Sequence, residues 1–126
     1  MQNKIRASSI FISSSQAIET AKLIPLTEQS SKSILRELYE GLREQCEAIG
    51  YLHGYKFLDH ESITFFLRDV LKEEALSKRF DRYRRLRNGI NYYGEDVDIE
   101  TVKEAIIEIP LLKKQLNKYS EDNNKK

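Results

Sequence analysis

The residues best suited to chemistry in this 126-residue chain lie between Arg82 and Gly94. Read as a helix at about 100° per residue, this stretch places Arg87 within an apolar stripe formed by Leu76, Phe80, Tyr83 and Ile90. An unpaired buried guanidinium costs several kcal/mol, so Arg87 should face an acidic partner, a pocket or a second subunit. Asn91 projects beside Arg87 and Asn88 lies on its flank, which marks these three residues as a candidate site.

The same segment is rich in cations. Between residues 78 and 87 a single acid, Asp81, stands against Lys78, Arg79, Arg82, Arg84, Arg85 and Arg87. Because arginine binds phosphate bidentately, one interpretation is a phosphate-binding surface for RNA or a nucleotide, with Tyr83, Tyr92 and Tyr93 able to stack on bases. The commoner explanation of such a run is a solvated helix face, and such tyrosines more often belong to a core or an interface.

The segment that follows reverses the charge. Lys103 is the one cation between residues 95 and 108, against the acids Glu95, Asp96, Asp98, Glu100, Glu104 and Glu108. Opposite charges attract, so the two segments could neutralise each other within one molecule or between two.

His53 and His60 are the only histidines, and their spacing and neighbours match no zinc-binding pattern. We therefore predict no metal ion and no cofactor. His60 lies near an expected helix start, which favours a capping or packing role, although an imidazole beside a cleft could also act as a general base. The sequence contains no glycine-rich phosphate loop and no nucleophile elbow.

Composition is that of an ordinary globular protein, with 40% hydrophobic and 33% charged residues and a net charge of +1. The chain therefore has no overall attraction to nucleic acid or membrane, and only local patches can argue for either. No apolar run approaches the ~20 residues that span a bilayer, which predicts a cytoplasmic protein without membrane contact. Cys46 falls on an apolar stripe and is expected to be a core residue in a reducing compartment.

Hydrophobic periodicity predicts five helices and no strand, in one domain over residues 1–119 with a disordered tail at 120–126. The first helix spans about 4–24, and its serines would let a neighbouring helix approach closely. The second starts at Thr27 or a later serine and ends at Gly50, and the third starts after Asp59. The fourth runs from near Leu76 to Gly94, and the fifth starts at Thr101 or Asp98 and is kinked near 106–110. The expected fold class is an all-α, antiparallel up-and-down bundle of four to five helices.

Gly89 lies inside the fourth helix, where it costs about 1 kcal/mol relative to alanine. Such a glycine indicates close approach of another backbone or of a ligand, unless it is a tolerated surface position.

The stretch Leu86–Tyr93, read as Leu-Arg-Asn-Gly-Ile-Asn-Tyr-Tyr, resembles the HEPN superfamily of prokaryotic all-helical proteins, together with the Gly54–Lys56 loop and Asp59-His60-Glu61. The resemblance covers about residues 30–119 and depends on motif order, helix count and the Arg87–Asn88 pair. It implies a HEPN-like homodimer in which two copies of an arginine-to-histidine motif share a cleft.

Active HEPN proteins are metal-independent ribonucleases, in which the motif arginine and a histidine promote attack of the ribose 2′-hydroxyl on phosphate. Arg87 and Asn88 match this motif. Tyr92, Tyr93 and Gly94 occupy the permitted histidine positions, and a tyrosine of ordinary pKa near ~10 is a poor base. The resemblance thus implies either a binding module without cleavage activity or a ribonuclease that uses Arg87 with Tyr92, His53 or His60.

Many HEPN proteins act with a minimal nucleotidyltransferase in a toxin–antitoxin pair. We expect a homodimer that docks such a partner and binds RNA or a nucleotide in a cleft lined by Arg87, Asn88, Asn91 and Tyr92. Further contacts to RNA or nucleotide are expected from Arg84, Tyr93 and His60. The remaining alternative is a purely structural dimer in which Arg87 pairs across the interface with Glu40 or Glu44.

Overall fold

The computed structural model describes residues 2–120, and all regular structure in that range is helical. The α-helices are α1 (Gln2–Leu23), α2 (Ser31–Leu52), α3 (Glu61–Phe65), α4 (Glu74–Tyr93) and α5 (Ile99–Leu116). A π-helical turn at Phe66–Val70 continues α3, and a 3₁₀ turn at Asn117–Tyr119 follows α5. The prediction of an all-helical bundle is confirmed for these residues. Residues 121–126, which make up most of the predicted tail, lie outside them.

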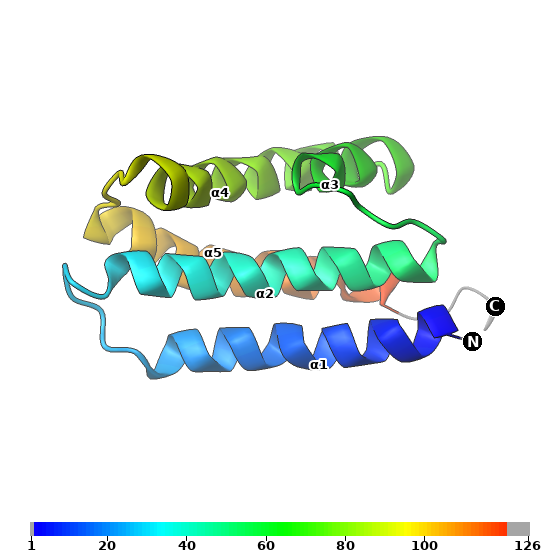
Figure 1. Cartoon of the computed structure of the whole chain (residues 1–126), viewed down its shortest axis with the longest axis horizontal. Coiled ribbons are helices and arrows are strands. Elements are labelled where there is room, and N and C mark those ends of the chain that lie inside the picture. Colours follow the sequence, from blue (N-terminus) through cyan, green and yellow to red (C-terminus); the bar gives the residue numbers. More distant parts are fainter. Residues whose placement is uncertain (1, 121–126) are drawn as a thin grey trace.

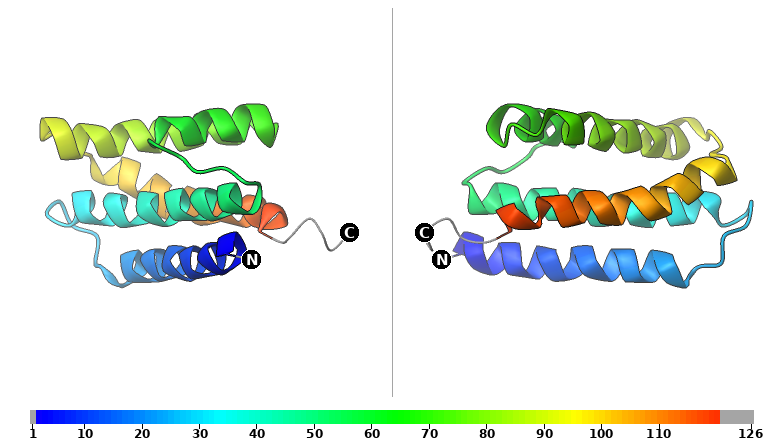
Figure 2. Two further views of the ribbon diagram at one scale, coloured as in Figure 1. Left: turned by 45° about the vertical axis from the view of Figure 1, so that its right-hand side comes forward. Right: turned by 180° about the vertical axis from the view of Figure 1, so that it is seen from behind.

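α2 is the central helix, and it packs against α1, α4 and α5. In Figure 1 α1 lies below α2 and the α3–α4 segment lies above it, and Figure 2 shows α5 crossing in front of α2 when the molecule is seen from behind. The colours show that the chain runs in opposite directions in α1 and α2, and again in α4 and α5 (Figure 1). The apolar residues that recur every three or four positions in α2 are buried: Leu35, Leu38, Tyr39, Leu42, Cys46 and Ile49.

Small residues bring α1 close to α2. The Ser14 hydroxyl donates a 2.6 Å hydrogen bond to the Gly41 carbonyl, and a Cβ atom on Gly41 would stand 3.0 Å from the Ser14 carbonyl oxygen. The close approach expected from the serines is therefore present. Cys46 is fully buried, and burial raises the pKa of its thiol to about 12, in keeping with its predicted place in the core.

The predicted end of the second helix at Gly50 is wrong, because α2 continues to Leu52. Gly50 lies beneath the Phe57 ring, which occupies the space that a side chain would need. The left-handed backbone conformation falls instead at Gly54, with φ +85°, in the loop that leads to α3.

The third helix starts as predicted, because Asp59 accepts a 2.8 Å hydrogen bond from the Ser62 backbone N–H. It widens after one turn, where the Leu71 N–H reaches back five residues to the Phe66 carbonyl at 3.1 Å. Of the apolar residues at helical spacing in this segment, Val70 is exposed, while Ile63, Phe66, Leu67 and Leu71 are buried.

α4 starts at Glu74, two residues before the predicted start, and ends at Gly94, whose φ of +63° suits a glycine that terminates a helix. The apolar stripe formed by Leu76, Phe80, Tyr83 and Ile90 is buried as predicted. Gly89 is approached closely by the side chain of Glu95, and not by another backbone.

α5 starts after Asp98, whose carboxylate accepts a 2.7 Å hydrogen bond from the Thr101 N–H. Of the two predicted starts, the Asp98 start is confirmed. The helix runs continuously through Pro110.

In the described residues, no helical segment combines the length and the hydrophobicity needed to cross a bilayer.

Candidate functional site

The start of α3 and the last turns of α4 enclose a hollow of about 420 Å³. We call it the Arg87 pocket, and its lining residues are Asp59, His60, Glu61, Arg84, Arg87, Asn88 and Tyr92. Five of the predicted site residues therefore lie together: His60, Arg84, Arg87, Asn88 and Tyr92. Sequence reasoning assigned no site role to the two carboxylates at the edge, Asp59 and Glu61.

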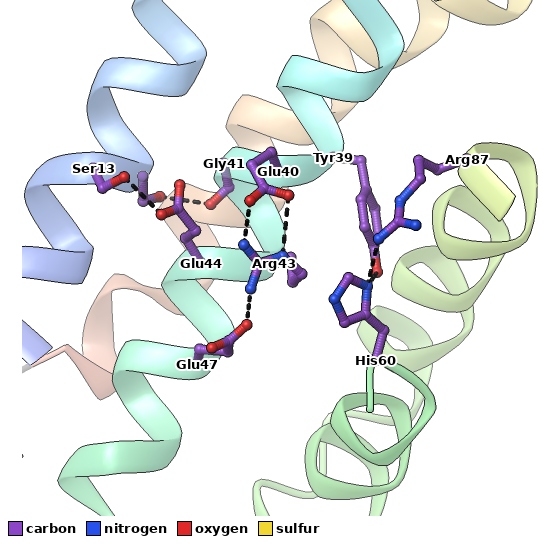
Figure 3. A network of polar contacts seen from close by, with 10 residues as sticks. Ser13, Tyr39, Glu40, Gly41, Arg43, Glu44, Glu47, His60 and Arg87 are labelled. Carbon is purple, nitrogen blue, oxygen red and sulfur yellow. Dashed lines mark hydrogen bonds and ion pairs between the residues drawn. The ribbon is translucent and has the colours of Figure 1, made fainter. Parts of the chain in front are cut away.

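Arg87, His60 and Tyr39 meet on the inner side of this pocket (Figure 3). The Arg87 Nη2 atom lies 2.7 Å from His60 Nδ1, and the Tyr39 hydroxyl lies 2.9 Å from the same nitrogen. The Arg87 guanidinium also lies over the Tyr39 ring, 5.1 Å from its centroid. Arg87 thus fills its place in the apolar stripe by stacking on a buried aromatic ring while its charged end reaches the pocket.

These contacts fix the protonation of His60. A guanidinium can only donate hydrogen bonds, so His60 Nδ1 must accept, and the Tyr39 hydroxyl must then donate to it. Burial, followed by the charges of Arg43 and Arg87, lowers the pKa of His60 to about 4. At neutral pH the imidazole is therefore uncharged and carries its proton on Nε2.

Tyr39 is the member of this cluster that was not among the predicted site residues, because it lies among the apolar residues of α2. It is fully buried, and burial raises the pKa of its hydroxyl well above the ordinary value. Its ring also packs against Phe80, with 5.6 Å between the ring centroids. Tyr39 therefore joins the hydrophobic core to the polar pocket, a role that its place in an apolar stripe conceals.

The two arginines of the pocket differ in their partners. Arg84 pairs with Asp81 at 2.8 Å and lies 3.9 Å from Glu61, which neutralises much of its charge. Arg87 contacts only neutral groups, since besides His60 and Tyr39 its Nη1 donates to the Asn88 side chain at 3.3 Å. No carboxylate of residues 2–120 lies within ion-pair distance of Arg87. Arg87 is therefore the cation of this pocket that remains available to an anion.

Two predicted site residues do not line the pocket. Asn91 accepts a 2.8 Å hydrogen bond from the Arg36 guanidinium on α2. Tyr93 is 78% exposed and lies beyond the pocket lining, whereas Tyr92, 70% exposed, stands at its rim.

The charge reversal after α4 is partly satisfied within the molecule, by ion pairs between α4 and α5. Arg79 binds the Glu108 carboxylate at 2.5 Å and 2.7 Å, and Arg82 lies 2.6 Å from Glu104. Tyr83 also donates its hydroxyl to Glu108. Arg79 and Arg82 of the basic segment and Glu104 and Glu108 of the acidic segment therefore neutralise each other within the molecule.

The acids once considered as partners for Arg87 across a dimer interface are engaged within the chain (Figure 3). Glu40 forms a salt bridge with Arg43, which also binds Glu47. Glu44 accepts a 2.6 Å hydrogen bond from Ser13.

The second histidine lies elsewhere. His53 Nδ1 is 3.0 Å from the Ile49 carbonyl, and its ring packs edge-on against Phe66. In the part of the chain that the structure describes, no three His, Cys, Asp or Glu side chains are grouped to hold a metal ion.

No protein-family model, curated protein or solved structure matches this chain. The residues themselves must therefore carry the functional argument. In chemical terms, the Arg87 pocket offers one available guanidinium, one neutral imidazole with an Nε2–H donor, an amide and an exposed phenol ring. Its edge also holds Arg84 and the carboxylates Asp59 and Glu61, of which Glu61 lies 3.9 Å from Arg84. This set suits an anion that also carries hydrogen-bond acceptors.

Proposed function

We propose that this chain is a HEPN-like module, an antiparallel helical bundle that forms a homodimer and binds the phosphate of RNA or of a nucleotide in the Arg87 pocket. By the same resemblance it acts with a nucleotidyltransferase partner in a toxin–antitoxin type pair.

The observation that supports phosphate binding most directly is the state of Arg87. Its guanidinium is half-buried against Tyr39, lines a pocket and contacts neutral groups only. A guanidinium held in this way keeps its charge for an incoming anion, and its planar donors match two phosphate oxygens. The basic run alone is a weaker argument, since Arg79 and Arg82 are already neutralised.

The hydrogen bonds of His60 favour binding over cleavage. Its Nδ1 is occupied by Arg87 and Tyr39, so Nε2 carries the proton and would donate to a phosphate oxygen. A general base must instead offer an unprotonated nitrogen to the proton that it removes. In the arrangement described, His60 therefore acts as a second phosphate ligand.

An active ribonuclease is the second candidate, because one observation favours it. The histidine that is absent from the motif positions at Tyr92, Tyr93 and Gly94 is replaced in space by His60, 2.7 Å from Arg87. If Arg87 turned to a bound phosphate and the Tyr39 hydroxyl also released Nδ1, this nitrogen could accept the proton of a ribose 2′-hydroxyl. The reaction would then need no metal ion.

The test compares wild type with Arg87→Ala and with Arg82→Ala, a control on the same helix whose arginine is paired with Glu104. Binding is measured with a labelled random-sequence oligoribonucleotide, and cleavage with total cellular RNA in chelator, after circular dichroism confirms the fold of each variant. We expect Arg87→Ala to weaken binding by at least about tenfold, because a charge-assisted contact to phosphate is lost, and Arg82→Ala to change it little.

Equal binding by wild type and Arg87→Ala, or no binding by either, would refute the phosphate site. Cleavage that disappears in both Arg87→Ala and His60→Ala would establish the ribonuclease instead.

The homodimer and the partner have tests of their own. Sedimentation of the wild type at micromolar concentration should give twice the monomer mass, and a monomer there would contradict the shared cleft. Co-expression with a nucleotidyltransferase encoded beside this gene should give a complex that elutes together. Separate elution would remove the partner from the proposal.

A further inference from the structure

A second hollow adjoins the Arg87 pocket. It measures about 500 Å³ and lies between α3 and α4, where its lining includes Thr64, Phe65 and Ser77. Glu61 lines both hollows. We call the second one the α3–α4 hollow.

The charged residues that line the α3–α4 hollow cancel. Its three cations, Arg68, Lys78 and Arg85, stand against Glu61, Glu74 and Asp81. Asp81 accepts hydrogen bonds from Arg84 and Arg85, while Lys78 lies 3.8 Å from Glu74. Arg68 pairs likewise with Asp69, so each cation of this hollow has a carboxylate partner and, unlike Arg87 in its own pocket, none is left for phosphate. It suits a neutral ligand with donors and acceptors of its own.

The aromatic ring in this hollow is Phe65. The Phe65 side chain is apolar but 45% exposed. The Arg68 guanidinium lies 5.0 Å from the centroid of its ring. Exposed aromatic rings and arginine planes are the groups on which nucleobases stack in single-stranded nucleic acid complexes. The Glu61 and Glu74 carboxylates can accept hydrogen bonds from the amino groups of a base.

The distance between the two hollows suits a phosphate and a base of the same or an adjoining nucleotide. Arg84 and Arg87 line the Arg87 pocket, while Asp81 and Lys78 line the α3–α4 hollow on the same helix. At a rise of 1.5 Å per residue, these positions are about 4.5 to 13.5 Å apart along the helix axis, and the distances from Arg87 are about 9 and 13.5 Å. A phosphate and a base attached to the same or the next sugar are separated by a similar distance.

We propose that the α3–α4 hollow is a base subsite, in which a nucleobase stacks on Phe65 while its phosphate is held by Arg87. This inference rests on the proposed function, since it names a second contact of the same ligand. It makes the preferred ligand a nucleotide or a single-stranded RNA rather than a phosphate compound in general.

The experiment uses two tetranucleotide probes with the same sugar–phosphate backbone. One is 2′-O-methyl tetraadenylate and the other is its abasic counterpart, and neither has a 2′-hydroxyl that the protein could use for cleavage. Their affinities are measured by calorimetry for wild type, Phe65→Ala and Phe65→Tyr. The control is Val70→Ala, an exposed apolar residue of the adjoining turn that does not line the hollow.

We expect wild type to bind tetraadenylate about tenfold more tightly than the abasic probe, as stacking of a base predicts. Phe65→Ala should lose most of this gain and leave the affinity for the abasic probe unchanged. Phe65→Tyr and Val70→Ala should both retain the gain.

Equal affinity of wild type for the two probes, or a gain that survives in Phe65→Ala, would overturn the base subsite while leaving the phosphate site intact. Failure of wild type to bind either probe would overturn the phosphate site and, with it, the base subsite.

Discussion

The two sides of α4 use the same residue type for opposite purposes. On the side that faces α5, Arg79 and Arg82 are neutralised by Glu104 and Glu108. On the side that faces α3, Arg87 meets an uncharged histidine and lines an open pocket. Both sides also contain a fully buried tyrosine, Tyr83 or Tyr39.

The difference lies in what each tyrosine hydroxyl binds. Tyr83 donates to the Glu108 carboxylate, whereas Tyr39 donates to neutral His60. A carboxylate completes the charge balance of its side, and an imidazole leaves the guanidinium charge unbalanced. A run of arginines on one helix can therefore be structural on one side and functional on the other, and the facing helix decides which.

The largest expected effect on stability comes from removing a carboxylate on the side of α4 that faces α5. Glu108→Gln should lower the free energy of unfolding by about 1–2 kcal/mol, because Arg79 and Tyr83 lose a charged hydrogen-bond partner. Urea denaturation at pH 7 measures it. The matched control is Glu100→Gln on the same helix, whose highly exposed carboxylate pairs only with Lys103 and should contribute below about 0.5 kcal/mol. Equal losses in the two variants would show that the α4–α5 ion pairs add no stability.

The next effect is the pH dependence of stability that His60 causes on the side of α4 that faces α3. His60 has a pKa lowered to about 4 in the folded chain, mainly by burial, so between pH 6.5 and 4 the unfolded chain binds more protons than the folded one. The contribution of His60 to the free energy of unfolding is therefore highest near pH 7, where His60 is uncharged in both states, and it decreases as the pH falls through this window. Wild type should lose more stability than His60→Gln between pH 7 and 4.5 in urea denaturation. Parallel losses would contradict a buried, uncharged His60.

A smaller effect on stability is expected when Arg87 loses its charge. Arg87→Met keeps an unbranched side chain over the Tyr39 ring and should change the free energy of unfolding by less than about 1 kcal/mol, since a cation–π contact is lost but no ion pair is. The pKa of His60 should rise at the same time, because a neighbouring positive charge is removed. NMR titration of the imidazole measures this shift. A loss of stability as large as that of Glu108→Gln would make Arg87 structural.

The smallest effect concerns the end of α4 next to the pocket. Gly89→Ala should raise the free energy of unfolding by up to about 0.5 kcal/mol, because alanine is the better helix residue and the Glu95 side chain that covers Gly89 can swing into solvent. Thermal unfolding measures the change. A clear destabilisation would mean that the Glu95 contact holds the α4–α5 loop, and Glu95→Ala would then give the same loss.

Local sequence signals predicted the elements well where the responsible groups are neighbours in the chain. Asp59 and Asp98 begin helices, and Gly94 ends one, because each acts on backbone groups a few residues away. The prediction failed at Gly50, where the Phe57 ring covers the glycine and α2 continues beneath it. That contact depends on how the following loop folds back.

Part of the candidate site could also be predicted from the sequence. The position of Arg87 within an apolar stripe required a pocket, a partner or a second subunit, and a pocket lies there. The partner of Asn91 was not accessible, since Arg36 lies 55 residues away on α2. The contact between His60 and Arg87 likewise joins residues 27 positions apart.

The helices, the buried stripe of α4 and the unusual position of Arg87 follow from the amino-acid sequence, because the 3.6-residue period and local capping act within single segments. Which arginines are neutralised, and which one remains available, follows from the way the helices pack. Charge balance depends on the side chain that faces each guanidinium, and that neighbour comes from another helix: Glu104 and Glu108 from α5, His60 from the start of α3, and Tyr39 from α2.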